Sequence, residues 1–264
     1  MNKPMFVKGR VIENKLIKDD YFIITIDSPD ITSKAKPGQF VMLSSWQMEN
    51  LFLKRPFSFY NIDSGQGIFT IFYKIVGKGT KILSQSKAGD EVELIGPCGN
   101  GFSFPINTKR IALVARGIGI ATLLPLALEA KKRGIEIYSF LSAREKTLLL
   151  GKDNLEPLSS HIFYTTDDDW KGTDGKVTFL LEELLKGNTV DFQAVYVCGS
   201  KRLARHIKEL QKEYRFAAYV SLEERMGCGI GACKGCVINT IHGYRRVCKE
   251  GPVFSLEEVI LNEG

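Results

Sequence analysis

The segment RMGCGIGACKGCVINTIHGYRRVC, residues 225–248, carries four cysteines whose spacing indicates an iron–sulfur site. They are Cys228, Cys233, Cys236 and Cys248. The order C-x4-C-x2-C, with a further cysteine after eleven residues, begins like the plant-type [2Fe–2S] pattern, in which a loop wraps the cluster and a distant thiolate completes its ligands. The spacing therefore predicts a [2Fe–2S] cluster that is bound by these four thiolates and transfers one electron at a time.

Glycines between the cysteines favour a cluster over a disulfide loop. Glycine permits positive φ and brings backbone N–H groups close to cluster sulfides. The glycines concerned are Gly227, Gly229, Gly231 and Gly235. A structural zinc site, disulfides and unrelated buried thiols are the alternatives. Zinc is usually bound by two C-x2-C-type pairs, and this segment has one such pair, Cys233 and Cys236.

The residues between the last two cysteines predict a β-hairpin. Residues 237–247 read as a strand, a turn at His242-Gly243 and a second strand. Such a hairpin would return Cys248 to the other three cysteines.

Length and composition indicate an ordinary globular protein. The 264 residues are 44% hydrophobic and 25% charged, enough for two domains and a small cluster module. The N-terminal sequence MNKPMFVKGRVIENK is not typical of a signal peptide, and no apolar run approaches the roughly 18 residues of a membrane span. We therefore expect a cytoplasmic protein without a membrane segment.

The charge distribution argues against a nucleic-acid partner, and the cysteine content favours a bound metal over disulfides. The net charge of +6 comes from 36 basic and 30 acidic residues spread along the chain, without the polybasic block typical of nucleic-acid binding. Nucleic acid is therefore not expected as a partner. Six cysteines in a reducing compartment are better explained by metal ligation than by disulfides, and Cys98 is predicted to be a small buried residue.

Residue patterns divide the chain into three parts. From residue 5 to about 102, short β-type runs separated by Gly, Pro and Asp predict a small antiparallel β-barrel. Strand and helix patterns then alternate, which predicts a parallel α/β sheet. We expect a β-barrel in residues 1–102, an α/β nucleotide-binding domain in 103–217 and a [2Fe–2S] module in 218–264.

This order of domains resembles the ferredoxin reductase superfamily. Within it, the detailed motifs are similar to the electron-transfer subunits of class 1B dihydroorotate dehydrogenases, over essentially the whole chain. The motifs are RPFS at 55–58, YKIVGKGT at 73–80, GPCGNGF at 96–102 and SLEERMGCGIGACKGC at 221–236. Further similar segments are Ser142-Ala143-Arg144 and TTDDDWKGTDGKVT at 165–178.

The resemblance implies that the barrel binds FAD. Arg55 would pair with the pyrophosphate, because a guanidinium forms planar, charge-assisted contacts with phosphate. Pro56 fixes the local φ, and Ser58 with the adjoining backbone would meet the isoalloxazine. For RPFS taken alone, a barrel strand with a surface arginine is the alternative. The implied FAD-binding residues are Arg55, Pro56, Phe57, Ser58, Phe72, Tyr73, Lys74, Gly79 and Thr80, of which the last two would supply backbone and hydroxyl donors.

A site for NAD(H) is expected after the first strand of the α/β domain. Gly117 and Gly119 follow the strand pattern RIALVA and precede a helix, where amides and the helix dipole can receive a pyrophosphate. Cys198, before Gly199, matches a strand end that faces nicotinamide in relatives. Three residues depart from the family pattern: Arg116, Thr122 and Ser200. We expect Arg116 to obstruct the nucleotide, the alternative being a phosphate contact.

The resemblance implies an oxidoreductase subunit in pyrimidine biosynthesis. It would pass electrons between NAD(H), FAD and the cluster, to or from an FMN-containing dihydroorotate dehydrogenase catalytic subunit, in a heterotetramer. No catalytic acid or base is expected, and His161, His206 and His242 are predicted to be surface or capping residues. The alternatives are a paralogous FAD/[2Fe–2S] reductase subunit with another partner, and a relay whose NAD site is weakened or lost.

Overall fold

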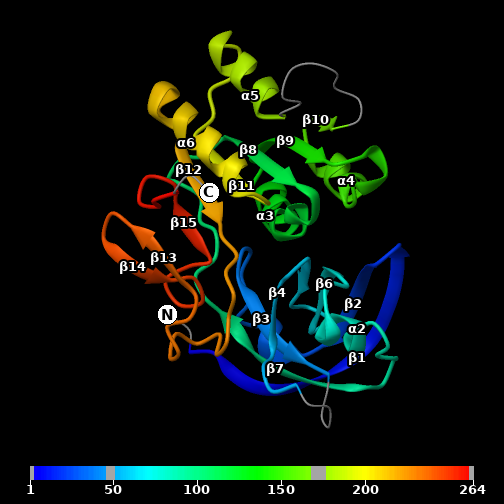
Figure 1. The fold of residues 1–264 in the computed structure, drawn as a ribbon. Helices are drawn as coiled ribbons and strands as arrows, with labels where there is room; N and C mark the ends of the chain where they lie inside the picture. The colour runs from blue at the N-terminus through cyan, green and yellow to red at the C-terminus, as the bar shows by residue number, and fades with distance from the viewer. Residues whose placement is uncertain (1–2, 46–50, 168–176, 262–264) are drawn as a thin grey trace. The chain divides into compact units, whose positions relative to one another are not determined.

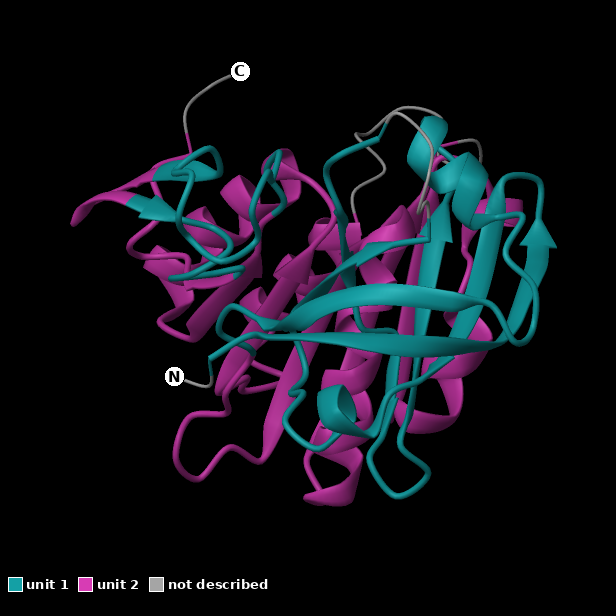
Figure 2. Cartoon of the chain, turned by 90° about the horizontal axis from the view of Figure 1, so that it is seen from below, with its two compact units in different colours: residues 1–101, 223–238, 245–252 teal, residues 102–222, 239–244, 253–264 magenta. Residues whose placement is uncertain are grey.

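The computed structural model describes residues 3–45, 51–167 and 177–261, and the chain divides into two compact units (Figure 2). Unit 1 consists of Met1–Gly101, Glu223–Ile238 and Arg245–Pro252. Unit 2 consists of Phe102–Leu222, Asn239–Tyr244 and Val253–Gly264. All four predicted cluster cysteines therefore belong to unit 1, together with the strands of the predicted barrel, while the bounds of the three predicted domains stay a prediction.

Unit 1 is built on a seven-stranded antiparallel sheet with the order β4-β3-β7-β1-β2-β6-β5 (Figure 1). The strands are β1 (Met5–Lys18), β2 (Tyr21–Asp27), β3 (Phe40–Ser44), β4 (Arg55–Ser58), β5 (Asn61–Asp63), β6 (Ile68–Lys74) and β7 (Glu91–Cys98), and two short helices are α1 (Pro29–Thr32) and α2 (Lys78–Leu83). Alternating residues such as Ile24 and Ile26, or Phe69 and Ile71, form its core. The predicted antiparallel β architecture is confirmed as a half-barrel sheet.

Unit 2 contains a six-stranded sheet with the order β10-β9-β8-β11-β12-β15. Its strands are β8 (Arg110–Arg116), β9 (Glu136–Ala143), β10 (His161–Thr166), β11 (Ala194–Cys198), β12 (Ala217–Ser221) and β15 (Val253–Ser255). The first five are parallel, as predicted, and β15 joins β12 in the antiparallel direction. Because β9 and β10 lie on one side of β8 and β11 lies on the other, strand order reverses between β8 and β11, the position where open α/β sheets bind ligands.

Helices connect the parallel strands of unit 2 (Figure 1). The α-helices are α3 (Ile120–Lys132), α4 (Lys152–Leu155), α5 (Val177–Lys186) and α6 (Lys201–Tyr214), and the 3-10 helices are η1 (Gly117–Gly119), η2 (Lys146–Leu148) and η3 (Glu156–Leu158). Among the described parts of the chain, no helix combines the length and apolar character needed to cross a membrane.

The predicted hairpin near the C-terminus is confirmed. It consists of β13 (Val237–Thr240) and β14 (Gly243–Arg246). Thr240 Oγ1 donates to Gly243 O at 2.7 Å and accepts the His242 N–H at 3.2 Å, which closes the turn. Beyond β14, Val247 N–H donates to Cys236 O at 2.8 Å. The hairpin thereby brings the last cluster cysteine back beside the third.

Candidate functional site

The four predicted cluster cysteines come together in unit 1 as two neighbouring pairs. Cys233 N–H donates to Cys228 Sγ at 3.4 Å, and Cys248 N–H donates to Cys236 Sγ at 3.4 Å. Gly231 N–H also donates to Cys248 Sγ, at 3.1 Å. These amides are the kind of donors that stabilise thiolate and sulfide charge in a cluster.

The two cysteine pairs differ in solvent exposure. Cys236 and Cys248 are each 2% exposed, whereas Cys228 is half-buried and Cys233 is exposed. All six cysteines of the chain are free thiols, so the structure contains none of the disulfides considered as an alternative. Within the described residues, no three Cys, His, Asp or Glu side chains converge on a position for a single ion. A binuclear cluster needs no such convergence, because its ligands are divided between two irons.

Two of the four glycines in the cluster loop have the backbone conformation expected from the sequence. Gly229 and Gly231 have φ of +71° and +82°. A Cβ on Gly229 would lie 2.2 Å from Met42 Cγ, so this position also has no room for a side chain. The expectation was wrong for Gly227 and Gly235, which lack positive φ. There a Cβ would make ordinary contacts at 3.5 and 3.6 Å, so the loop does not require glycine for space.

The pKa values of two thiols, Cys228 of the outer pair and Cys248 of the inner pair, shift in opposite directions. Burial tends to raise the pKa of Cys228, but the backbone amides of Cys233, Ile230 and Ala232 outweigh it and lower that pKa to about 7. Burial raises the pKa of the Cys248 thiol to about 12, and a neighbouring cysteine adds to the shift. Before metal binds, Cys228 is therefore more readily ionised than Cys248, and ligation of iron by Cys248 must release its proton.

Sequence reasoning missed Arg246, which holds the cluster loop from the end of β14. Its Nη1 donates to Gly231 O at 2.9 Å, while its Nε donates to Glu250 Oε2 at 3.1 Å. Glu250 also accepts the Arg246 N–H at 2.8 Å, and this pairing holds the pKa of Glu250 below its usual range. The i, i+4 spacing of the two charges was visible in the sequence, but the bond to Gly231 depends on the folded hairpin.

The predicted flavin segment RPFS forms β4, an edge strand of the unit 1 sheet. Pro56 lies opposite Met42 on β3, and Ser58 lies opposite Phe40. An edge strand tolerates proline because only one side of the strand pairs with a neighbour, so the N–H that proline lacks is not needed on the open side. The other backbone groups on that open side can bind another molecule. Pro56 and Ser58 share one face of the strand, since their positions differ by two. This arrangement fits a flavin held along the edge.

Arg55 begins β4. Its Nη1 donates to Leu53 O at 2.6 Å, and its side chain is half-buried. Next to it, Lys54 Nζ pairs with Glu93 Oε2 at 2.5 Å. The pairing at Lys54 holds the pKa of Glu93 below its usual range. A guanidinium at the start of the edge strand fits the predicted pyrophosphate contact, which stays a prediction.

Other predicted flavin residues divide between two faces of the sheet. Phe57 packs against the core, and its ring meets the buried Tyr73 ring edge-on at 5.8 Å. Tyr73 Oη donates to Asn14 Oδ1 at 3.1 Å, and burial raises its pKa. Phe72 lies on the opposite face of β6, and exposed Lys74 follows it. Side-chain contact with FAD is therefore better founded for Phe72 and Lys74 than for Phe57 and Tyr73.

The hydroxyl of Thr80 is used inside its own turn. Thr80 Oγ1 accepts the N–H groups of Val76 and Gly77 at 2.9 and 3.2 Å, and donates to Gly77 O at 3.0 Å. It caps the first turn of α2, where Gly79 is also buried. The sequence led us to expect a hydroxyl donor for FAD here, but that hydrogen is already bonded to Gly77 O. Any contribution of Gly79 and Thr80 falls to the backbone.

In unit 2 the residues predicted to bind NAD(H) lie between β8 and β11, where the strand order reverses. A Cβ on Gly119 would lie 2.6 Å from Cys198 O, and one on Gly199 would lie 2.5 Å from Arg116 O. The ends of β8 and β11 therefore approach each other so closely that only glycine fits at these two positions. Gly117 has a φ of +54° with open space around its Cβ position. The structure brings Gly117, Gly119 and Cys198 together, as a nucleotide site requires.

Arg116 is engaged by an acidic residue at the end of β10. Its Nη1 and Nη2 donate to the Asp167 carboxylate at 3.2 and 2.7 Å. This bidentate bond holds the pKa of Asp167 below its usual range. The obstruction expected from the sequence stays a prediction, but the guanidinium now has a defined partner. Residues 168–176 of the similar segment TTDDDWKGTDGKVT lie outside the described residues.

Comparisons with protein families match two regions that contain these sites. The family described as iron-sulfur cluster binding domain of dihydroorotate dehydrogenase B matches residues 223–260, and the oxidoreductase FAD-binding domain matches residues 8–102. The first region includes all four cluster cysteines and the second includes RPFS. Binding of FAD and of an iron–sulfur cluster is therefore shown at the level of family.

Relatives that match nearly the whole chain belong to the same family as the cluster-binding domain. The dihydroorotate dehydrogenase B (NAD(+)) electron transfer subunit of Caldanaerobacter subterraneus subsp. tengcongensis is 38% identical over 258 residues, which are 96% of this chain and 98% of the relative. The subunit of the same name from Geobacillus kaustophilus is 36% identical over 261 residues, 95% of this chain and 97% of the relative.

Solved structures show the same fold. The structure of an NADH-dependent reduced ferredoxin-NADP oxidoreductase is 29% identical, with a TM-score of 0.84 over 96% of this chain and 90% of that chain. The ferredoxin reductase of carbazole 1,9a-dioxygenase, 16% identical, has a TM-score of 0.62 over 81% of this chain and 67% of that chain. The chain therefore has a ferredoxin reductase-like fold.

Proposed function

This chain belongs to the family of dihydroorotate dehydrogenase B electron transfer subunits, and we propose on that premise that it carries electrons between NAD(H) and a dihydroorotate dehydrogenase catalytic subunit. Its cofactors are FAD and a [2Fe–2S] cluster. We propose further that the catalytic subunit contains FMN, that the two subunits form a heterotetramer in the cytoplasm, and that 1–102, 103–217 and 218–264 serve as flavin, nucleotide and cluster modules.

One observation carries the proposal: Met42 connects the flavin strand with the cluster loop inside unit 1. On β3, Met42 lies opposite Pro56 of RPFS. Its side chain also contacts the cluster loop at Gly229. A single buried side chain therefore separates the two segments that are proposed to hold the cofactors. Such proximity supports electron transfer between them within one compact unit.

The residues of the chain bind and orient the cofactors, and none of them has to transfer a proton. When bound, FAD exchanges a hydride with nicotinamide and single electrons with the cluster. Arg55 would hold the pyrophosphate of FAD, and the open edge of β4 at Pro56 and Ser58 would hold the flavin ring. In unit 2, the amides that begin at Gly117 would receive the pyrophosphate of NAD(H). Because the cofactors carry the electrons and the residues only bind them, no catalytic acid or base was expected.

The cysteine pairs suggest which side of the cluster faces the partner. Buried Cys236 and Cys248 would hold the inner iron, and Cys228 with exposed Cys233 would hold the outer iron. Ile230, between the outer cysteines in sequence, is 49% exposed. Val237, in the same segment, is 40% exposed, and the exposed apolar surface of these two residues beside the cluster ligands supports docking of the catalytic subunit there. A reducing cytoplasm suits six free thiols.

The test is anaerobic electron transfer with purified proteins. NADH should bleach the flavin and cluster absorbance of this chain, and addition of a dihydroorotate dehydrogenase catalytic subunit from the same cell should couple NADH oxidation to orotate reduction. The Cys248→Ala protein should lose that coupling but keep flavin reduction by NADH. Reduction of both cofactors without any transfer to the dihydroorotate dehydrogenase subunit would refute the proposed partner.

A second candidate is a reductase subunit with the same cofactors and another partner. It is favoured by the likeness to the NADH-dependent reduced ferredoxin-NADP oxidoreductase, whose similarity extends over 96% of this chain. Co-purification from the source cell, followed by identification of the bound protein, distinguishes the two. Recovery of a dihydroorotate dehydrogenase supports the first, and recovery of a different flavoprotein supports the second.

A further inference from the structure

We propose that Arg246 fixes the cluster loop of unit 1 so that two backbone N–H groups point at cysteine sulfurs, and that it thereby raises the reduction potential of the cluster. Arg246 is the last residue of β14, two positions before Cys248. It is a positioning residue, because its side chain acts on the cysteines through the backbone of the loop. The inference rests on the proposed binding of a [2Fe–2S] cluster by the four cysteines.

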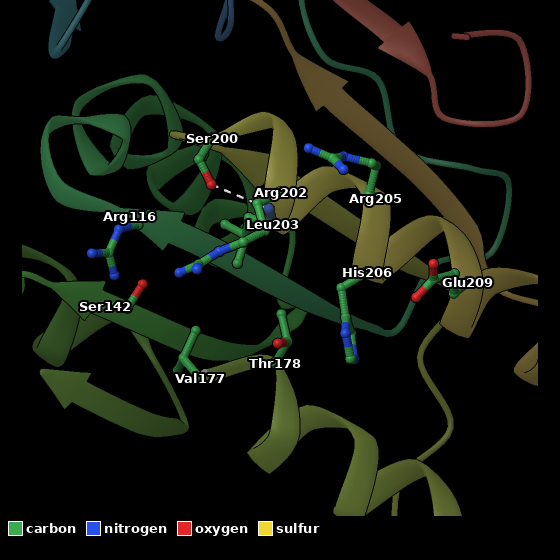
Figure 3. A pocket seen from close by; sticks show the side chains of 10 residues that line it. All are labelled: Arg116, Ser142, Val177, Thr178, Ser200, Arg202, Leu203, Arg205, His206 and Glu209. Atoms are coloured by element: carbon green, nitrogen blue, oxygen red, sulfur yellow. Dashed lines mark hydrogen bonds between the residues drawn. The ribbon is translucent and has the colours of Figure 1, made fainter. Parts of the chain in front are cut away.

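Arg246 differs from the arginines that line a cavity in unit 2 (Figure 3). That cavity shares Ser142 with the hollow at Gly117, so its arginines belong to the site predicted for NAD(H). They are Arg116, Arg202 and Arg205. Arg246 lies instead in unit 1, which also contains all four predicted cluster cysteines. Its role is therefore to be found in the cluster loop.

The guanidinium of Arg246 holds the carbonyl of Gly231. Its Nη1 donates to Gly231 O at 2.9 Å, across 15 positions of sequence. The N–H of Gly231 itself donates to Cys248 Sγ at 3.1 Å. The next N–H, at the other end of the peptide group that Arg246 holds, belongs to Ala232 and is one of the backbone donors to Cys228. One side-chain bond thus fixes the backbone between a donor to the inner cysteine pair and a donor to the outer pair.

The glycine makes this bond necessary. Gly231 has a φ of +82°, and glycine populates positive and negative φ about equally, so its peptide groups turn easily unless a bond holds them. A hydrogen bond to a carbonyl also polarises the peptide group and strengthens the N–H at its other end as a donor. Arg246 therefore both orients the Ala232 N–H and makes it a stronger donor.

Glu250 holds Arg246 in the required orientation. Nε and Nη2 of Arg246 donate to Glu250 Oε2 and Oε1 at 3.1 and 2.5 Å, which is a bidentate bond. Asn100, beyond the end of β7, donates from Nδ2 to Glu250 O at 3.0 Å. A continuous series of hydrogen bonds therefore runs from the flavin-binding sheet through Glu250 and Arg246 to Gly231. Because the carboxylate offsets the charge of the guanidinium, we expect Arg246 to act mainly through the direction of its bond to Gly231.

Backbone N–H groups that point at the cysteine sulfurs favour the reduced form of a cluster. Reduction adds a negative charge, and hydrogen bonds to the sulfurs are among the factors that set the potential of an iron–sulfur cluster. Without the bond from Arg246, the carbonyl of Gly231 can turn, and the amides on either side of it lose their alignment with Cys248 and Cys228. The potential of the cluster should then fall.

Anaerobic redox titration, followed by visible absorbance, measures this potential in the purified protein. Arg246→Lys keeps the charge but loses the planar fork that bonds Glu250 and Gly231 together. We expect reduction of the cluster in Arg246→Lys to be about tenfold less favourable, which corresponds to a potential about 59 mV lower. Arg245→Lys is the matched control, because Arg245 precedes Arg246 on β14 and faces the opposite side of the strand. Its potential should equal that of the parent.

Pulsed electron paramagnetic resonance after exchange into D₂O gives a second measurement, since it detects the exchangeable amide protons that couple to the reduced cluster. These couplings should be weaker in Arg246→Lys and also in Glu250→Gln, which keeps the arginine but loses the charged partner that orients it. Glu250→Gln decides the question if Arg246→Lys does not retain a cluster.

The outcomes separate this role from the proposed cofactor. A parent without a cluster spectrum would overturn both. A parent that has the cluster, with variants that keep its potential and its proton couplings, would overturn the role of Arg246 alone. An equal fall of potential in Arg245→Lys and Arg246→Lys would also overturn it, because a general effect of lysine on β14 would then explain the result.

Discussion

Gly229 of the cluster loop lies directly against Met42 of β3, so that a Cβ at Gly229 would be 2.2 Å from Met42 Cγ and 2.7 Å from Met42 Sδ. Met42 is 1% exposed and lies opposite Pro56 of β4, the strand proposed to hold the flavin. Because interiors are densely packed, this contact fixes the cluster loop on the flavin-binding sheet. This glycine–methionine contact thus helps to position the cluster loop on the sheet, together with the hydrogen bonds from the Asn100 side chain to Lys249 O and Glu250 O.

Gly229→Ala should destabilise the loop and reduce iron content. The new methyl group clashes with Met42, and its φ of +71° costs an alanine about 1–2 kcal/mol even without a clash. The measurement is thermal unfolding together with iron analysis for Gly229→Ala, Met42→Ala and the double variant. We expect the double variant to be more stable than the sum of the single effects predicts. Strict additivity would show that the contact does not constrain the loop.

Replacing any one of the four predicted cluster cysteines by alanine should abolish the [2Fe–2S] spectrum and leave FAD bound, because a thiolate ligand is removed. The four variants are Cys228→Ala, Cys233→Ala, Cys236→Ala and Cys248→Ala. Visible absorbance, electron paramagnetic resonance of the reduced protein and iron analysis measure the outcome. Cys98→Ala is the control, since Cys98 is buried outside the ligand set and its Sγ bonds to Ile95 O at 3.3 Å. A normal cluster in Cys248→Ala, or stoichiometric zinc without iron in an anaerobic parent, would contradict the ligand assignment.

Arg55→Ala should weaken FAD binding by about ten- to a hundredfold, the effect of losing a charge-assisted phosphate contact worth roughly 1.5–3 kcal/mol. Flavin fluorescence during serial dilution gives the dissociation constant. Arg10→Ala, an exposed arginine on β1 of the same unit, serves as the matched charge control. Equal retention of FAD by Arg55→Ala and the parent would remove Arg55 from the pyrophosphate site.

Gly119→Ala should slow flavin reduction by NADH by at least about tenfold. An added Cβ would lie 2.6 Å from Cys198 O and 2.7 Å from Cys198 C, so the dinucleotide loop and the end of β11 must move apart. Stopped-flow reduction by NADH measures the effect, with dithionite reduction as the control for intact flavin. Gly65→Ala, in an exposed turn where an added Cβ would meet nothing closer than Asp63 Oδ1 at 3.4 Å, tests for a general effect of alanine. An unchanged NADH rate would show that nicotinamide does not use this loop.

The ion pair between Arg116 and Asp167 should give a pH-dependent contribution to stability. Hydrogen bonding to Arg116 lowers the pKa of Asp167 from 3.8, so the folded state favours its ionised form. The contribution is therefore present above about pH 3.8 and lost as the pH falls through the lower folded-state pKa. We expect Asp167→Asn to be less stable than the parent in urea at pH 7, with a difference that shrinks toward pH 3. The difference should be small, because Asp167 is 46% exposed.

A difference between Asp167→Asn and the parent that stays constant from pH 7 to pH 3 would contradict the role of the ionised pair. Asp153→Asn, at an exposed position on α4, is the control for loss of a surface carboxylate.

The sequence alone determined the features that depend on local spacing and periodicity. The four predicted cluster ligands fall within 21 residues, and a short hairpin connects the last two, so their convergence could be predicted from residues 228–248. Strand alternation and the change to alternating strands and helices likewise predicted the antiparallel and parallel sheets, because these patterns reflect which side of each element is buried. The cysteine spacing itself predicted the cluster, and the resemblance to a known family then implied FAD.

Tertiary structure decided how residues distant in the sequence are paired. Arg116 and Asp167 are 51 positions apart, and they meet because β8, β9 and β10 are neighbours with their carboxyl ends at one edge. Met42 meets Gly229 for the same kind of reason, since neither residue carries a local signal of the other. Burial of Thr178 beside α6 is also invisible in its local sequence. Such contacts follow from the packing of whole elements, whose order and close approach no short window of sequence specifies.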